Sequence, residues 1–117
     1  MEVTLRSDAI FDAVANANLP VKFAKVDLAA SGDLVALVTG KKIRVVAGSL
    51  VAAGAVTVKF QTGAATDLTG AMSLITGTPL NLAFSPAGHF ETVAGAKLNL
   101  VLGGAVQVSG WLVYVEV

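Results

Sequence analysis

The chain has 117 residues, of which 55% are hydrophobic and 14% are charged, and its eight basic and eight acidic side chains give no net charge. So apolar a chain can offset the entropy of ordering, which excludes a disordered protein, and its length supports one hydrophobic core. Zero net charge argues against binding of nucleic acid or a membrane by bulk electrostatics, and the lack of cysteine excludes disulfide frameworks and thiolate zinc sites.

Residues 1–20 are expected to form an N-terminal arm or a short helix, ahead of one β-sandwich domain over residues 21–117. Segment 8–17 has the apolar stripe of a short helix, and an extended arm fits it equally well. Ile10 and Phe11 lie outside the strand pattern that follows, so we expect them to pack on their own domain or along a neighbouring subunit. The N-terminus lacks the basic and apolar segments of a secretory signal, and we expect a protein used without export.

From Val21 onward, the sequence alternates with the period of two that is typical of β-strands. Val56, Val58 and Phe60 fall on one face of a strand, and the polar residues between them fall on the other. Glycine-containing turns separate such segments at short spacing. The pattern predicts an all-β fold, an antiparallel β-sandwich or jelly-roll-like barrel of about eight strands. The strands are expected within 21–28, 34–38, 42–52, 56–61, 72–75, 80–84, 98–102 and 111–117.

Several of these strands are apolar on both faces. Phe84 and Trp111 fall in phase with the predicted core, whereas Leu112, Tyr114 and Val46 fall on second faces. Because a solvated second face should be polar, we expect barrel closure to cover a few of these side chains and identical subunits to cover more.

The second half of the chain is nearly uncharged. Residues 61–117 carry only Asp67, Glu91, Lys97 and Glu116, whereas globular domains usually carry about 25% charged residues. Part of the surface that this half forms is therefore expected to face protein instead of water.

No arrangement of residues indicates catalysis, so we do not expect an enzyme. His89 is the only histidine, and no serine lies in the GxSxG pattern of many hydrolases. A metal site would have to combine His89 with Asp67 and Glu91, and we interpret both acids as solvated turn residues. A phosphate-binding loop is not indicated either. Its motif has a glycine five residues before the Gly-Lys pair, and the residue at that distance before Gly40 is Val35. We therefore expect no cofactor and no metal ion.

The densest positive charge is at Lys41, Lys42 and Arg44. In a strand, Lys42 and Arg44 share one face, which is typical of a solvated surface and also suits contact with an acidic partner. Exposed rings of Phe90, Trp111 and Tyr114 would form a sugar-binding platform, whereas core packing is the simpler interpretation. The residues that we expect to contact other proteins are Ile10, Phe11, Lys41, Lys42, Arg44, His89, Phe90 and Tyr114.

Residues 42–117 resemble small structural proteins of tailed bacteriophages. The shared features are a valine-rich strand pair, a TDLTG turn, a PxGxFET stretch, a GxxLxL strand and a final GxLxYVEV strand. In this sequence the resemblance rests on residues 42–49, 56–60, 66–70, 84–92, 95–100 and 110–117.

The resemblance implies a capsid decoration, or cement, protein of sandwich or jelly-roll type, commonly a trimer on the head lattice. Subunits of such a protein hold one another and clamp the major capsid protein against the pressure of the packaged DNA. This protein would be made in the host cytoplasm and act on the capsid surface of the virion, with no direct contact to nucleic acid or membrane. Similar sandwiches also serve at phage tail or fibre tips, so a receptor- or glycan-binding tip module is the alternative.

Overall fold

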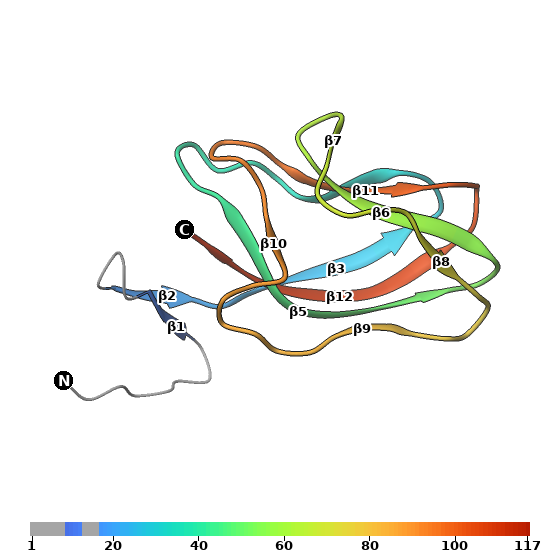
Figure 1. Ribbon diagram of the computed structural model, residues 1–117, viewed down its shortest axis with the longest axis horizontal. Coiled ribbons are helices and arrows are strands. Elements are labelled where there is room, and N and C mark those ends of the chain that lie inside the picture. Colours follow the sequence, from blue (N-terminus) through green and yellow to red (C-terminus); the bar gives the residue numbers. More distant parts are fainter. Residues whose placement is uncertain (1–8, 13–16) are drawn as a thin grey trace.

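The computed structural model describes residues 9–12 and 17–117, and the regular structure in these residues is β-strand. Figure 1 shows two layers of strands, with a small hairpin at one end. Among the residues that are described, no helix is long and apolar enough to cross a membrane.

The first sheet has β12 (Val108–Glu116) at its centre. This strand pairs antiparallel with β3 (Lys22–Leu28) on one side and with β5 (Ile43–Ala52) on the other. The short strands β9 (Leu80–Leu82) and β10 (Phe90–Glu91) pair with successive parts of the far side of β5. β3 therefore forms one edge of the sheet, and β9 and β10 form the other.

The second sheet is built around β11 (Leu98–Leu102), which pairs with β4 (Gly32–Val35) and β6 (Val56–Thr62). Two short strands, β7 (Thr66–Asp67) and β8 (Met72–Leu74), pair with the far side of β6. All of these strand pairings are antiparallel. The chain crosses from the first sheet to the second between β3 and β4, and again between β5 and β6.

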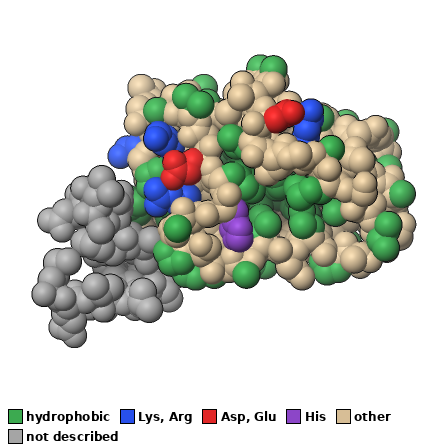
Figure 2. Space-filling view, in the orientation of Figure 1, with side chains coloured by type: hydrophobic (Ala, Val, Ile, Leu, Met, Phe, Trp, Pro, Cys, Tyr) green, Lys and Arg blue, Asp and Glu red, His purple; other side chains and the backbone are tan. Residues whose placement is uncertain are grey.

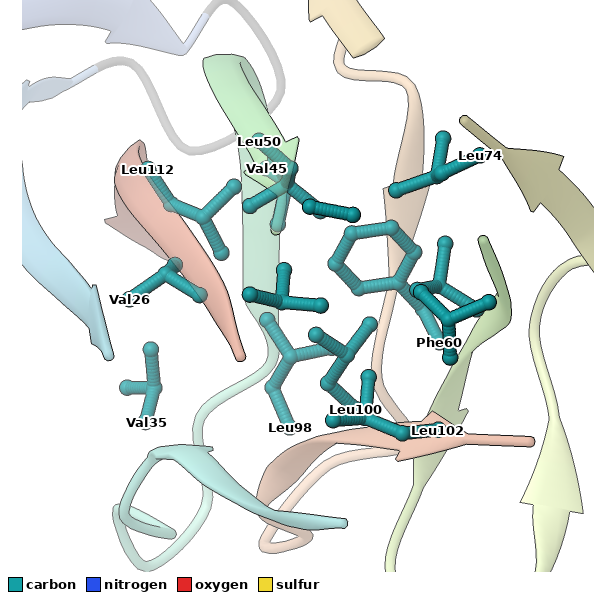
Figure 3. Packing of buried hydrophobic residues seen from close by; sticks show 14 of the residues in the cluster. Val26, Val35, Val45, Leu50, Phe60, Leu74, Leu98, Leu100, Leu102 and Leu112 are labelled. Carbon is teal, nitrogen blue, oxygen red and sulfur yellow. The ribbon is translucent and has the colours of Figure 1, made fainter. Parts of the chain in front are cut away.

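The hydrophobic core lies between the two sheets (Figure 3). Leu50 and Val26 enter it from the first sheet, and Val58, Phe60 and Leu100 enter it from the second; all five are fully buried. Burial of these large apolar side chains is the main favourable term in folding. The predicted antiparallel β-sandwich is confirmed, and the alternation at residues 56–61 identified the inward face of β6 correctly.

β12 turns the opposite set of residues toward the core from the set that the sequence predicted. Leu112 is fully buried in the core and Tyr114 packs against it, whereas Trp111 is 48% exposed. Gly48 lies opposite Leu112 on β5, and a side chain at this glycine would overlap the Leu112 side chain. Gly48 thus makes room for Leu112. The predicted core positions of Trp111 and of Phe84, which is 61% exposed, are wrong.

A second, smaller apolar cluster lies against the first sheet. Its buried members are Val46, Ala47, Val113 and Val115, and the residues that pack against them are Leu19, Val21 and Val117. Val46 is the extra residue of a bulge in β5, because Val113 pairs with Ala47 whereas Tyr114 pairs with Val45. The chain's own terminal segments therefore contribute to the burial of Val46. The prediction that barrel closure or other subunits would cover Val46 is wrong.

Residues 9–12 and 17–20 form the two strands of an N-terminal hairpin, at the end of the sandwich near the C-terminus (Figure 1). β1 (Ala9–Asp12) pairs antiparallel with β2 (Ala17–Pro20), and β2 leads directly into β3. The helix considered for residues 8–17 is therefore wrong at residues 9–12, which are extended.

Candidate protein-contact surfaces

The outer face of the first sheet exposes large hydrophobic side chains on three adjacent strands. Phe23 on β3 is 75% exposed, Trp111 on β12 is 48% exposed and Val51 on β5 is 38% exposed. Trp111 pairs with Lys25 of β3, two residues after Phe23. On its other side Trp111 pairs with Ser49 of β5, two residues before Val51. Diagonal neighbours at this spacing are within reach of aromatic side chains. We call Phe23, Val51 and Trp111 the apolar outer face.

The outer side of the second sheet is polar. The Gln61 side chain donates from Nε2 to Asp67 Oδ1 at 2.8 Å, and Lys59 Nζ lies 3.2 Å from the same oxygen. These hydrogen bonds, first from Gln61 and then from Lys59, hold the pKa of Asp67 below its ordinary value of 3.8. Asn99 pairs with Gln61 across β11 and β6, and both side chains are buried. We call Lys59, Gln61, Asp67 and Asn99 the polar outer face.

Lys41 and Lys42 lie just before β5 and Arg44 lies at its start, where β5 pairs with β10, whereas Ile43 and Val45 face the core. Lys41 and Lys42 are exposed. Arg44 Nε lies 2.7 Å from Glu91 Oε1, because β10 pairs Glu91 directly with Arg44. Figure 2 shows Lys and Arg side chains around an acidic side chain at one end of the molecule. Contact with another protein at Lys41, Lys42 and Arg44 stays a prediction.

A further ion pair joins the two ends of the described sandwich chain. Lys22 Nζ lies 3.0 Å from Glu116 Oε1, and the hydrogen bond and charge of Glu116 raise the pKa of Lys22. Tyr114, two residues before Glu116, pairs with Lys22 across β12 and β3. This pair is exposed, so it contributes little to stability.

His89 is exposed in the turn before β10, and its Nε2 donates to the carbonyl oxygen of Ala83 at 2.6 Å. The preceding residue, Gly88, has a φ of 86°, and a Cβ there would overlap the Arg44 side chain. Only glycine fits this tight turn. Within the part of the chain that the structure describes, His89, Glu91 and Asp67 do not gather into a group that could hold a metal ion.

The three rings considered for a sugar platform do not share a surface. Phe90 packs against Phe60 with ring centroids 4.5 Å apart and an interplanar angle of 37°, and it contacts the core. Tyr114 also packs against the core, whereas Trp111 belongs to the apolar outer face. Core packing is therefore correct for Phe90 and wrong for Trp111. Tyr114, which the alternation places on a second face, packs against the core instead. Phe90 and Tyr114 are only partly exposed, and their contact with another protein stays a prediction.

Half-buried hydrophobic side chains close the core along the edges formed by β8, β9 and β10. Figure 2 shows hydrophobic side chains in a hollow beside the histidine. This lining gives the edge an apolar character without adding charge. The side chains that pack against the core from these edges and from the turn after β7 are Leu68, Met72, Leu80, Leu82 and Phe90.

Ile10 and Phe11 belong to β1, whose backbone pairs with β2. Their side chains lie outside the described residues. Their predicted contact with a neighbouring subunit stays a prediction.

The exposure of Phe23 on β3 has no counterpart among the predictions from the sequence. β3 pairs with β12 along its whole length without a register shift. Ala24 and Val26 face the core, and Phe23 faces outward. The signal that could have located Phe23 is the alternation of Ala24, Val26 and Leu28 as one inward set.

No protein-family model matches the chain, and no curated protein matches it. The resemblance to phage head proteins therefore stays an interpretation of the sequence.

Proposed function

We propose that the protein is a structural protein of a virion, a capsid decoration protein that stabilises a bacteriophage head as a homo-oligomer. The observation that carries this proposal is the apolar outer face, where Phe23, Val51 and Trp111 are exposed on adjacent strands. A group of exposed large hydrophobic side chains on a compact domain is typical of a surface that another protein covers, and aromatic residues are enriched at such contacts.

The difference between the two outer faces suits a protein that sits on a shell. Gln61 and Lys59 already bind Asp67 on the polar outer face, so that side is suited to water. The apolar outer face belongs to the other sheet and is available for the major capsid protein. Because the lattice repeats this contact in many copies, individually weak contacts add up to a stable coat.

The exposed lysines and the N-terminal hairpin lie close to one end of the same sandwich. Lys41 and Lys42 suit an acidic patch on the capsid protein, and Ile10 and Phe11 are carried by the hairpin beyond the sandwich. These residues are proposed as secondary contacts, because charged contacts at a rim set orientation and association rate more than affinity.

The alternative role at a tail or fibre tip depends on a shared aromatic rim. Phe90 and Tyr114 pack inward, and Trp111 lies on the outer face, so three rings are not presented together. This arrangement favours a role as a capsid decoration protein on the head over a role as a receptor- or glycan-binding module at a tail or fibre tip.

Binding to purified heads tests the proposal. Heads assembled from the phage genome that encodes this chain, with its gene deleted, are mixed with the purified protein and sedimented, and the ratio of this chain to the major capsid protein is measured by quantitative mass spectrometry. We expect saturation at a ratio set by the capsid lattice and release of DNA at a higher temperature. Lack of binding, or a copy number that matches a single tail, would contradict the proposal.

A pair of variants locates the contact. Phe23→Ser with Trp111→Ser removes both rings of the apolar outer face and should weaken head binding about tenfold or more. Phe84→Ser is the matched control, since Phe84 is similarly exposed but lies in the loop between β9 and β10. We expect Phe84→Ser to bind heads as the natural chain does; equal losses in both variants would show that the contact lies elsewhere.

A further inference from the structure

β3 presents one side of its backbone without a partner strand in the described part of the chain. All seven of its residues pair with β12, from Lys22 opposite Tyr114 to Leu28 opposite Val108, and β12 is the only described strand with which it pairs. An edge strand of this length offers a row of backbone N–H and C=O groups that can pair with another strand.

The side chains of β3 do little to block such pairing. The strand has no proline within it and no register shift against β12, and Ala24, Val26 and Leu28 face the core. β3 carries two lysines, Lys22 and Lys25, and lysine on an edge strand opposes pairing. The charge of Lys22 is paired with Glu116 of the same chain. Here Lys25 is followed on the same face by Asp27, so the edge carries both signs of charge.

We infer that two copies of this chain join by antiparallel pairing of their β3 strands about a two-fold axis at Val26. In this register Val26 lies opposite Val26 of the second copy, and Lys25 lies opposite Asp27 of the second copy. Two-fold symmetry makes the lysine–aspartate pair occur twice. Ala24 lies opposite Leu28 of the second copy, so the inward faces of the two sheets continue into each other.

Neighbouring registers are less favourable. An axis at Lys25 places two lysines opposite each other, and an axis at Asp27 places two aspartates opposite each other. An axis at Ala24 leaves Asp27 opposite Val21 and Lys22 opposite the core residue Val26. An axis between residues would put inward residues opposite outward ones. The charge pattern therefore selects the axis at Val26.

This pairing goes beyond the proposed function and does not depend on it. It joins two first sheets edge to edge, which places the two apolar outer faces on the same side of one continuous sheet and leaves Trp111 uncovered. The product is a closed pair, which differs from the trimer that the resemblance implies. Head binding and edge pairing can therefore fail independently of each other.

Charge reversal on the full-length protein tests the inference. Size-exclusion chromatography with light scattering, over a concentration series, should give the natural chain a mass of twice its 11.8 kDa. Lys25→Asp places two aspartates opposite each other, and Asp27→Lys places two lysines opposite each other, in both cases twice per pair. Each single variant should raise the dissociation constant of the pair about tenfold or more, and the double variant should restore it.

Amide hydrogen exchange and a surface control complete the test. Amides on the free side of β3 should exchange slowly in the natural chain and the double variant, and fast in both single variants. Lys59→Asp reverses a charge on the polar outer face, away from β3, and should leave the mass unchanged. A monomer at all concentrations, a trimeric mass, or a pair that tolerates both single reversals would overturn the inference.

Discussion

The two outer faces of the sandwich differ in the contacts of their side chains: one face has hydrogen-bonded polar groups, and the other has exposed hydrophobic groups. On the polar outer face, Gln61 and Lys59 hold Asp67, and Asn99 is buried beside Gln61. On the apolar outer face, Phe23 and Trp111 stay exposed on paired strands. Three of the four residues of the polar outer face belong to the nearly uncharged second half of the chain, and two of these three are amides. A low content of charged residues therefore does not by itself identify a contact surface.

The contrast between the two outer faces depends on which side chains of each strand face the core. Substitutions in β6 should have the largest effect on the free energy of unfolding. Val58 is fully buried, so Val58→Asp places an unpaired charge in the core and should cost about 4 kcal/mol or more in the free energy of unfolding. We expect a protein that is unfolded, or nearly so, by circular dichroism at room temperature.

The adjacent residue provides the control. Lys59 points to the polar outer face and contacts the exposed carboxylate of Asp67. Lys59→Glu should therefore leave the fold intact, with a loss within about 1 kcal/mol. If Val58→Asp and Lys59→Glu behaved alike in urea unfolding, the outer side of the second sheet would be assigned to the wrong residues.

The first sheet has its own sensitive position at Gly110 in β12. Its φ is 153°, and a Cβ there would overlap the carbonyl oxygen of Ser49 on β5. Gly110→Ala should destabilise the chain by about 3 kcal/mol, because the strand must shift away from β5. Urea unfolding measures the loss. Gly104→Ala, with nothing near its added methyl group, should be close to neutral; equal effects would mean that β12 does not pass so close to β5.

Alternation along single strands was sufficient to predict the fold class. Thr57 and Lys59 are polar between Val56, Val58 and Phe60, so only one face of β6 could enter the core. Along β12 the alternation does not indicate which face points to the core, because both faces are apolar. On the inward face, Gly48 leaves space for Leu112, and this contact joins residues far apart in sequence.

The candidate surfaces were harder to predict, because they depend on strand pairing. Arg44 and Glu91 are 47 positions apart and meet only through the pairing of β10 with β5. The exposure of Trp111 beside Phe23 depends on the register of β3 against β12. The bulge at Val46 likewise follows from the pairing of β5 with β12 and has no signal in the sequence of β5 alone.

Trp111 can report directly on the apolar outer face, because it is the only tryptophan in the chain. Its emission should be that of a partly exposed indole and should be quenched by acrylamide in the free protein. Pairing along β3 should leave this quenching unchanged, whereas binding to heads should reduce it severalfold as the ring becomes covered. Phe23→Ser should keep the emission intensity and increase the quenching. Strong protection of Trp111 in the free protein would contradict the contrast between the two faces.

The polar outer face should be sensitive to acid through Asp67. Because the folded-state pKa of Asp67 lies below 3.8, its contribution to stability is present above the unfolded-state pKa and is lost as the pH falls through the folded-state pKa. Asp67→Asn should therefore be slightly less stable than the natural chain at neutral pH and equally stable in strong acid, as measured by urea unfolding. The effect is small because the carboxylate is exposed.

A variant of Gln61 tests whether the hydrogen bond from Gln61 contributes to the lowered pKa of Asp67 beside the charge of Lys59. Gln61→Ala removes the donor that has the largest effect on Asp67 and keeps Lys59 in place. The pKa of Asp67, followed by NMR titration of its side-chain carbon, should then rise toward 3.8. Lys59→Gln keeps the Gln61 donor and removes the charge of the lysine, so it should also raise the pKa of Asp67 toward 3.8. A pKa that does not move in Gln61→Ala would mean that Lys59 alone lowers the pKa of Asp67.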